Sequence, residues 1–359
     1  MEPPFQWTME YCWGPVPSMI GKPPSFAGRP ETSPRDYDVL AEMLRTLRLS
    51  GSVFLNARFS VPFGVVSPKQ YDERTPMAHL RHISIFHLIA DGTCTIEIAT
   101  GDRRIVSAGD ILLLPFADAH KFWNGDVVDM AFGPDLMRPG LVKGMWTVNH
   151  GGGGEVTRMV CGYIESSEFL FAPVFRSLPL LLVDWTGDDK VSALITSTVR
   201  EILLLADAAI PGSELMLGRL MESLFVEVVR RYAERLPPSA KGWFAALNDP
   251  IVGRALQFVH GDPARRWTLD ELAREAGASR TVLAERFSTV LSQPPIEYVT
   301  SWRMQLAAER IRNSKDSLAA IAADVGYESE AAFNRAFKRV TGVTPGRWRE
   351  GDTASRSDP

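Results

Sequence analysis

The sequence predicts an α+β chain with several domains: an N-terminal β-barrel, a helical hairpin, and a C-terminal all-α domain built on a repeated pair of short helices. Three observations predict this arrangement. Short apolar runs alternate with turn signals between residues 52 and 184, apolar residues return to helical spacing over 188–236, and one two-helix pattern then occurs twice. A chain of 359 residues has room for two or three such domains.

Composition excludes several classes of protein. With 45% apolar and 23% charged residues, the chain is typical of soluble proteins with buried cores. No run approaches the ~20 apolar residues of a membrane helix, and the N-terminus lacks the basic start and apolar stretch of a secretory signal. The cysteines, Cys12, Cys94 and Cys161, form no CxxC pair, so we expect reduced thiols and no structural zinc. These features predict a cytoplasmic protein without a membrane partner.

The strand signals lie in the N-terminal half. Residues 1–35 are rich in proline and glycine and show no apolar period, which predicts a disordered extension or a start assigned too far upstream. Residues 36–187 contain short apolar runs about ten residues apart, separated by turn pairs such as Asp91-Gly92. This spacing is typical of an all-β sandwich or barrel, so we expect one β-barrel domain over 36–187.

Helical spacing returns over residues 188–236. A break at residues 210–212 divides the segment into two helices, and the second helix carries Leu217, Met221, Leu224 and Phe225 on one face. The pattern predicts a helical hairpin whose apolar face either packs on the barrel or forms a dimer seam. Two prolines open the next segment, residues 237–248, which we expect to be a linker.

A two-helix pattern occurs twice within residues 249–350, and residues 351–359 form a short tail. The two copies are residues 268–279 and 317–329. Each copy opens with a hydroxyl residue suited to cap a helix, and each ends its short helix at a glycine, which can adopt the left-handed conformation of a tight turn. Two matching copies make a chance similarity improbable.

Each copy then places a serine, Ser279 or Ser329, before a second helix over residues 280–290 or 330–340. A short helix, a glycine turn and a capped helix make a helix-turn-helix unit, whose second helix enters the major groove of DNA. A helical run over 295–311 joins the units and spans about 25 Å. This length suits two recognition helices about one DNA turn, roughly 34 Å, apart. The pattern predicts an all-α DNA-binding domain with two helix-turn-helix units.

The chain resembles the AraC/XylS family of bacterial regulators. The likeness lies in both helix-turn-helix units, the long helix between them, and the closing segment 337–349. The N-terminal half resembles the cupin-type sensor domain of one branch of this family. That likeness lies in residues 47–51, the Phe86-His87-Leu88 run, residues 109–115 and the glycine run 151–154.

The resemblance implies a function and a set of partners. It implies a sequence-specific regulator of transcription that binds double-stranded DNA and responds to a small-molecule effector in the cupin-like barrel. It further implies a homodimer formed through the hairpin 188–236, with Leu224 in the seam, and RNA polymerase as a partner. Neither enzyme activity nor a cofactor is implied.

The resemblance also places the DNA contacts. Base-contacting positions fall on Thr281, Ala284, Glu285, Glu330, Ala331, Asn334 and Arg335. Arg335 is the strongest single choice, because arginine pairs bidentately with guanine. Arg280 is left for the groove or its edge. The expected phosphate contacts, which position the helices, are Ser279, Arg286, Arg303, Ser329, Lys338 and Arg339. The apolar Val282, Leu283, Phe287, Val290, Phe333, Phe337 and Val340 should pack in the core. The alternative for any one charge is a merely solvated helix face.

The barrel supplies the expected effector site. His120 follows Gly109 and Pro115 with the spacing of the second cupin signature. We assign His87, His120 and Trp123 to the effector site on this basis. No His-x-His pair followed by glutamate is present, and His82 would lie on the opposite face of a strand from His87. The sequence therefore predicts no metal site and no catalytic residues.

Two further hypotheses compete with the ligand-responsive regulator. One is a metal-dependent cupin enzyme fused to a DNA-binding domain, which would need three or four converging metal ligands. The other is a regulator whose barrel only dimerises and binds no effector.

Overall fold

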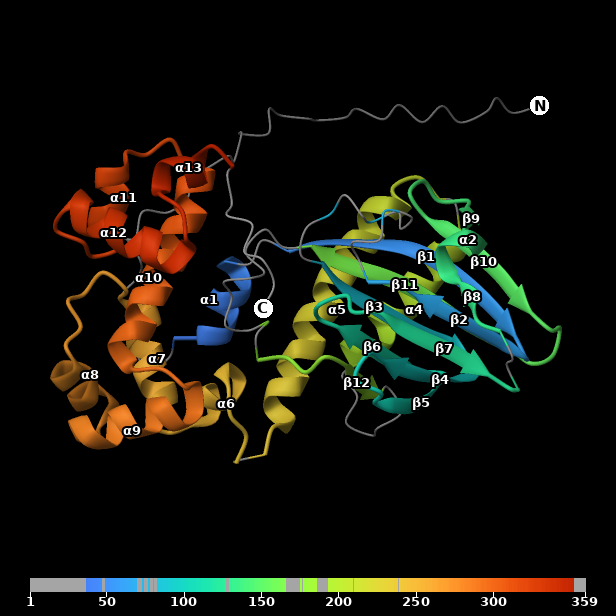
Figure 1. Cartoon of the computed structure of the whole chain (residues 1–359), viewed down its shortest axis with the longest axis horizontal. Helices are drawn as coiled ribbons and strands as arrows, with labels where there is room; N and C mark the ends of the chain where they lie inside the picture. Colours follow the sequence, from blue (N-terminus) through green and yellow to red (C-terminus); the bar gives the residue numbers. More distant parts are fainter. Residues whose placement is uncertain are drawn as a thin grey trace, which may run out of the picture.

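A computed structural model describes residues 37–46, 49–69, 73, 77, 80, 83–126, 129–165, 175, 177–185, 193–208, 210–237 and 239–351. The predicted extension 1–35 and all but the first residue of the predicted tail lie outside these residues. Figure 1 shows a β-rich half and a helical half, which confirms the predicted fold class. None of the helices in the described part of the chain is both long and apolar enough to span a bilayer.

The N-terminal half contains two sheets that face each other. The large sheet has seven strands in the order β12-β6-β3-β11-β1-β10-β9, and the small sheet has five in the order β5-β4-β7-β2-β8. In chain order the strands are β1 (Ser50–Ser60), β2 (Phe63–Ser67), β3 (Ile83–Asp91), β4 (Thr93–Ile98), β5 (Arg103–Ser107), β6 (Asp110–Leu114), β7 (His120–Asn124), β8 (Ala131–Phe132), β9 (Arg138–Pro139), β10 (Trp146–Gly151), β11 (Val156–Glu165) and β12 (Leu182–Trp185). A short helix, α2 (Gly133–Leu136), follows β8. An apolar core fills the space enclosed by the sheets.

The predicted hairpin consists of α4 (Ala193–Asp207) and α5 (Ser213–Arg235). Helix α5 packs directly on β1, because Gly51 and Gly218 meet there without side chains. A Cβ added to Gly218 would lie 2.6 Å from the Gly51 carbonyl oxygen. The apolar face of α5 covers the large sheet, and Leu224 is only 1% exposed. Leu224 therefore packs on its own barrel, and the expected place of this side chain in a dimer seam is wrong.

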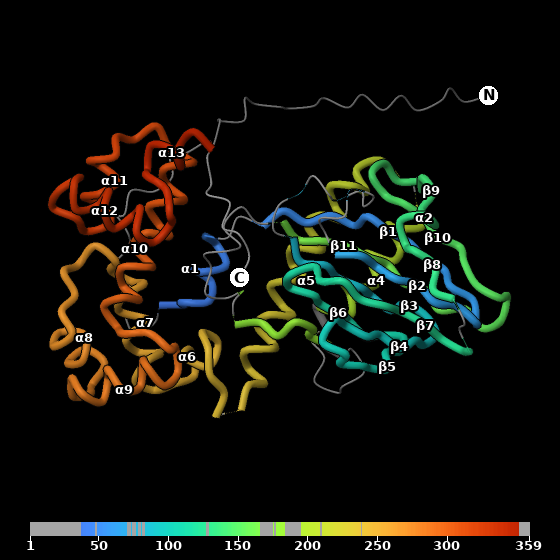
Figure 2. The backbone as a smooth tube through the Cα atoms, in the orientation of Figure 1, coloured from blue at the N-terminus to red at the C-terminus, as the bar shows by residue number. Residues whose placement is uncertain are grey.

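The C-terminal half is entirely helical. Its elements are α6 (Trp243–Asn248), α7 (Val252–Gly261), α8 (Leu269–Ala276), α9 (Arg280–Leu291), α10 (Pro295–Asn313), α11 (Leu318–Asp324), α12 (Glu330–Thr341) and α13 (Pro345–Arg349). Half of the expected linker is a helix, because Trp243 and Phe244 of α6 are buried in the core. Figure 2 traces α10 between a first pair of helices, α8 and α9, and a second pair, α11 and α12.

The two halves share one continuous apolar core. The first described helix, α1 (Val39–Thr46), precedes the barrel in sequence, yet it packs on α7 of the helical half. The division at residue 249 expected from the sequence is therefore not a division in packing. Figure 1 shows α1 and α5 between the strands and the C-terminal helices.

Candidate nucleic-acid interface and barrel cavity

Both two-helix units are built by the same local interactions. The first helix of each begins at a hydroxyl cap: Thr268 Oγ1 accepts a hydrogen bond from the Glu271 amide (3.2 Å), and Ser317 Oγ accepts one from the Ala320 amide (3.1 Å). Each turn then contains a left-handed glycine, with φ 72° at Gly277 and 83° at Gly326. A side chain at either position would be strained. The helix-turn-helix repeat inferred from the sequence is thus present in both copies.

The second helices present their first turns to solvent. Ser279 Oγ and Ser329 Oγ each accept a hydrogen bond from the amide three residues later, at 3.3 Å in both units. The exposed residues that follow on α9 are Arg280, Thr281, Glu285 and Arg286, with Ala284 partly exposed. Val282, which we expected in the core, is 38% exposed. The first turn of α9 therefore offers an apolar contact, of the kind that suits a thymine methyl group, between polar ones.

Arg286 has a partner inside the protein. Its guanidinium forms an ion pair with Asp249, whose side chain is only 5% exposed. The same carboxylate accepts hydrogen bonds from the Ile251 and Val252 amides (3.0 and 2.9 Å) at the start of α7. These hydrogen bonds and the pair with Arg286 hold the pKa of Asp249 below its ordinary value, although burial acts in the opposite direction. Arg286 thus anchors α9 to α7, and its expected phosphate contact is replaced by this ion pair.

On α12 the candidate residues divide into two groups. Glu330, Ala331, Arg335 and Lys338 are exposed on the helix, and Phe333 and Phe337 are buried beneath them as expected. Asn334 differs, because its Oδ1 atom is buried and has no hydrogen-bond partner among the described residues. In this orientation the amide does not present its carbonyl to a base.

Arg339 lies one turn beyond Arg335 along α12. It lines a cavity of about 890 Å³ together with Thr300 and Ser301 of α10, Thr341, and Leu291 at the carboxyl end of α9. This cavity therefore lies at the carboxyl ends of both second helices. Arg339 is exposed beside Lys338 on the same helix, and its expected phosphate contact stays a prediction.

Arg303 of α10 joins the two units. Its guanidinium donates hydrogen bonds to the carbonyl oxygens of Pro263 and Arg265, both at 2.7 Å, and contacts that of Gly326 at 3.5 Å. The first two carbonyls precede α8 and the third lies in the α11–α12 turn. Gly326 permits this approach, since a Cβ there would lie 2.4 Å from the Ala264 oxygen. Burial lowers the pKa of Arg303. Arg303 therefore holds the two units together, and the expected phosphate contact is wrong.

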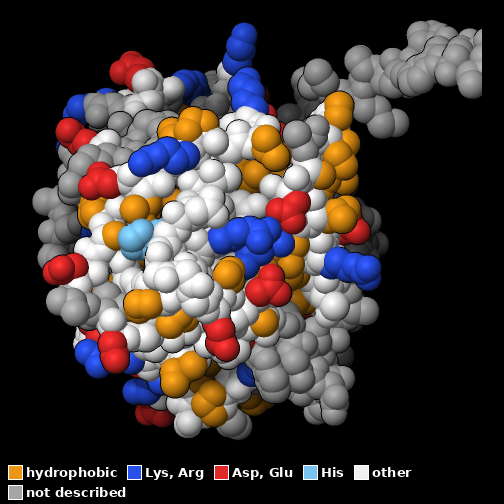
Figure 3. All heavy atoms as spheres, turned by 90° about the vertical axis from the view of Figure 1, so that its right-hand side faces the viewer, with side chains coloured by type: hydrophobic (Ala, Val, Ile, Leu, Met, Phe, Trp, Pro, Cys, Tyr) orange, Lys and Arg blue, Asp and Glu red, His pale blue; other side chains and the backbone are white. Residues whose placement is uncertain are grey.

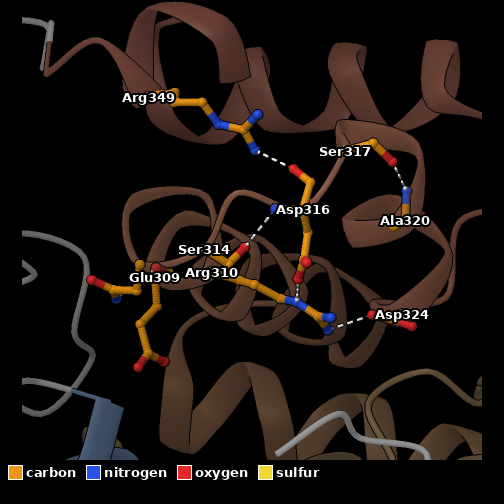
Figure 4. Close-up of polar contacts among 9 residues, drawn as sticks. Glu309, Arg310, Ser314, Asp316, Ser317, Ala320, Asp324 and Arg349 are labelled. Carbon is orange, nitrogen blue, oxygen red and sulfur yellow. Dashed lines mark hydrogen bonds and ion pairs between the residues drawn. The ribbon is translucent and has the colours of Figure 1, made fainter. Parts of the chain in front are cut away.

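The second unit is also fixed to the end of α10. Arg310 forms ion pairs with Asp316, at 3.0 Å, and with Asp324 of α11. From α13, Arg349 donates a hydrogen bond to the Asp316 carbonyl oxygen at 2.7 Å. Figure 4 shows Asp316 between these two arginines, next to the Ser317 cap. These contacts connect α10, α11 and α13, the three helices that pack around α12.

The barrel encloses the second candidate site. His87 of β3 and His120 of β7 meet inside it, with their Nε2 atoms 3.0 Å apart. Cys161 of β11 lies on the other side of His87, with Sγ 2.9 Å from Nδ1. His120 Nδ1 lies 2.8 Å from the Asp118 carbonyl oxygen. The sequence placed the two histidines together but missed Cys161, because its strand pairing with His87 is a tertiary feature.

Trp123 does not belong to this group. Successive residues of β7 point to opposite faces, so Phe122 enters the barrel and Trp123 faces outward. The Arg103 guanidinium lies 5.7 Å from the centre of the Trp123 ring. His82 lies outside the described residues. Within the part of the chain that is described, no three His, Cys, Asp or Glu side chains are placed to hold a metal ion.

Comparison with known proteins agrees with both halves. A cupin family model matches residues 38–234, and a helix-turn-helix domain model matches residues 272–351. The chain belongs to the AraC/XylS family, in a branch with a cupin N-terminal domain. A putative AraC-like transcription regulator of Streptomyces antibioticus is 46% identical over 139 residues, which cover 39% of this chain and 46% of that protein. The chain thus matches about half the length of that relative.

Other proteins match over a longer span. The regulator AlkR of Acinetobacter baylyi is 27% identical over 278 residues, which cover 74% of this chain and 87% of that protein. Among solved structures, ToxT of Vibrio cholerae with a bound unsaturated fatty acid is 13% identical over 87% of this chain and 98% of that one, with a TM-score of 0.32.

In this AraC-type chain, the buried histidine pair should make stability depend on pH. Burial lowers the pKa of His120 from 6.5 to about 4, and it also lowers the pKa of His87. Between these values the unfolded state binds more protons than the folded state. The free energy of unfolding should therefore fall as the pH drops from about 6.5 to about 4, by about 3 kcal/mol from His120.

Urea denaturation at a series of pH values measures this dependence. The variant His120→Gln should lose much of it, because glutamine does not titrate. His150, which lies at the barrel surface, provides the control, and His150→Gln should keep the dependence of the parent chain. If all three proteins lose stability equally on acidification, the histidine pair is not its source.

Proposed function

We propose that this chain is a transcriptional regulator that inserts α9 and α12 into successive major grooves of double-stranded DNA. The observation that carries this proposal is the pair of serine-capped helices, which present exposed first turns from two units that Arg303 holds in one frame. The helix-turn-helix match supports it. Figure 1 shows both units at the end of the molecule remote from the strands, where a duplex has access to them.

The exposed residues divide into proposed base and phosphate contacts. We assign base contacts to Thr281, Ala284, Glu285, Glu330, Ala331 and Arg335, and phosphate contacts to Ser279, Arg280, Ser329 and Lys338. Arg280 is available because its ion pair with Asp270, at 3.7 Å, is exposed on both sides and such pairs are weak. Asn334 would have to turn its amide outward to contact adenine.

The barrel end of the molecule lacks the charge pattern of a nucleic-acid surface. Figure 3 shows this face with basic and acidic side chains interspersed, and neither sign forms a continuous patch among the described atoms. A protein that binds DNA needs clustered positive charge against the phosphates. This face of the barrel therefore does not suit a DNA duplex.

Selection of binding sites from random duplexes by the full chain tests the proposal. We expect two short enriched elements about ten base pairs apart. Arg335→Ala should remove the sequence preference at one element only and weaken binding by about 1–3 kcal/mol. Lys338→Ala should weaken all sequences alike and reduce the salt dependence. Arg104→Ala on the barrel is the control. Binding without any enriched sequence would reduce the protein to a general nucleic-acid binder.

The contact made by Arg303 predicts how strictly the spacing of the two elements is selected. Hydrogen bonds from a charged donor contribute about 1.5–3 kcal/mol each, so Arg303→Ala should let the two units move relative to each other. The parent chain should prefer the native spacing to a spacing that is two base pairs longer. We expect Arg303→Ala to reduce this preference on the order of tenfold, which corresponds to about 1.4 kcal/mol.

Gel-shift titration with a set of spacer lengths measures this preference. The control is Arg266→Ala, which removes an exposed ion pair with Glu328 between the same two units. This variant should change the spacing preference little. Circular dichroism identifies any loss of helix in either variant. A folded Arg303→Ala protein that keeps its full spacing preference would contradict the positioning role.

We also propose that the chain acts as a homodimer through the outer face of its hairpin. Large apolar side chains are exposed at the α4–α5 end of the hairpin, among them Leu204, Leu215 and Met216 at 58%, 69% and 52%. Exposed apolar patches of this kind mark interaction sites. Family membership alone supports RNA polymerase as a further partner, and the barrel as the site of a small-molecule effector.

Sedimentation distinguishes a dimer formed through this exposed face from one formed through the buried face that carries Leu224. Leu215→Glu should give a folded monomer, because the side chain already lies in solvent. Leu224→Glu should instead unfold the hairpin, because it would place a charge against the sheet. A Leu215→Glu protein that remains dimeric would exclude this face.

A further inference from the structure

The polar groups inside the barrel form one connected chain. It runs from Cys161 Sγ to His87 Nδ1, from His87 Nε2 to His120 Nε2, and from His120 Nδ1 to the Asp118 carbonyl oxygen, with separations of 2.9, 3.0 and 2.8 Å. Both histidines are almost fully buried. This series of hydrogen bonds thus connects three strands across the interior of the barrel.

Hydrogen-bonding rules assign every proton in this series of hydrogen bonds. A carbonyl oxygen only accepts, so His120 Nδ1 carries a proton, and the neutral ring then accepts at Nε2. His87 must donate from its own Nε2, which leaves its Nδ1 as an acceptor. The Cys161 thiol donates to that atom and keeps its proton, because burial raises its pKa. Each ring nitrogen therefore has a partner.

The cavity beside these hydrogen-bonded groups has apolar walls. Its volume of about 70 Å³ is bounded by His87 and Cys161 and by aromatic, aliphatic and methionine side chains from both sheets and α2. Ser67, at the end of β2, is the remaining polar side chain among the described lining residues. A volume of 70 Å³ equals the space that two or three water molecules occupy in the liquid, at roughly 30 Å³ each.

We propose that the barrel binds a small, uncharged, apolar effector, such as a short hydrocarbon or an unsubstituted aromatic ring. A ring needs roughly 150 Å³, so the walls of the cavity must move apart to admit it. An ionised or strongly polar ligand would lose its water and find no open hydrogen-bonding group on the histidines, which is costly. The flexible methionines Met77, Met137 and Met159 adapt to an irregular apolar shape. This inference rests on the proposed role of the barrel as the effector site.

Three probes of similar size and different polarity test the ligand class on the full chain without DNA. They are benzene, phenol and benzoate, and the readout is the midpoint of thermal unfolding, because a ligand of the native state raises it. We expect benzene to raise the midpoint most, phenol less, and benzoate not at all. Zinc ion is tested in parallel, because two facing histidines could instead hold a metal.

A chemical rescue locates the binding. Cys161→Ala removes the thiol donor and leaves His87 Nδ1 as an open acceptor beside the cavity. Phenol can then donate its hydroxyl proton to that atom, so the order of phenol and benzene should reverse. Cys94→Ala is the matched control, because Cys94 is also buried but is not among the residues that line the cavity. The control should keep the parent order.

Several results would overturn the inference. Stabilisation of the parent chain by benzoate or zinc ion beyond that by benzene would show an ionic site. The same order of phenol and benzene in Cys161→Ala and Cys94→Ala would place binding elsewhere. Absence of any response to benzene while the DNA selection succeeds would refute the ligand class alone. A benzene response with no selected DNA sequence would instead refute the proposed function.

Discussion

The helical half depends on one partly buried guanidinium. Arg303 donates hydrogen bonds to carbonyl groups before α8 and contacts the carbonyl of the α11–α12 turn, and Gly326 lets these segments approach. Carbonyl groups buried without donors would be costly, so neither unit can turn away from the other without losing these bonds. A duplex presents its grooves at a fixed repeat. The fixed frame made by Arg303 is what would allow both recognition helices to bind together.

The apolar core of the helical half continues onto the large sheet of the barrel half, and the interior core of the barrel lies on the other face of that sheet. Trp243 of α6 donates a backbone hydrogen bond to Ser177 Oγ at 2.8 Å and an indole hydrogen bond to Tyr298 of α10 at 3.0 Å. The Tyr298 hydroxyl in turn lies 2.7 Å from His260 Nε2 of α7. The proposed binding of an effector in the barrel would shift this arrangement only to the extent that the ligand prefers one state over another.

Local features could be predicted from the sequence, and tertiary ones could not. The caps at Thr268, Ser279, Ser317 and Ser329 and the turns at Gly277 and Gly326 depend on neighbours within a few residues, so the repeat was identified correctly. The assignments that failed depend on contacts across the fold. Arg286 meets a carboxylate 37 residues away, Arg303 meets carbonyls about 40 residues away, and Trp123 turned outward because the register of β7 places its neighbour inside. A helical period likewise does not say which surface an apolar face covers, as Leu224 shows.

One rule separates the side chains that can serve a ligand from those that cannot. A polar side chain recognises a ligand only when its hydrogen-bonding atoms are not already paired within the protein. Arg335 and Lys338 satisfy this condition, whereas Arg286 and Arg303 have internal partners. In the barrel the rule acts in the opposite sense, because pairing between His87, His120 and Cys161 leaves an interior that favours apolar matter. A histidine that looks like a ligand group in the sequence therefore becomes, through its partners, part of an apolar wall.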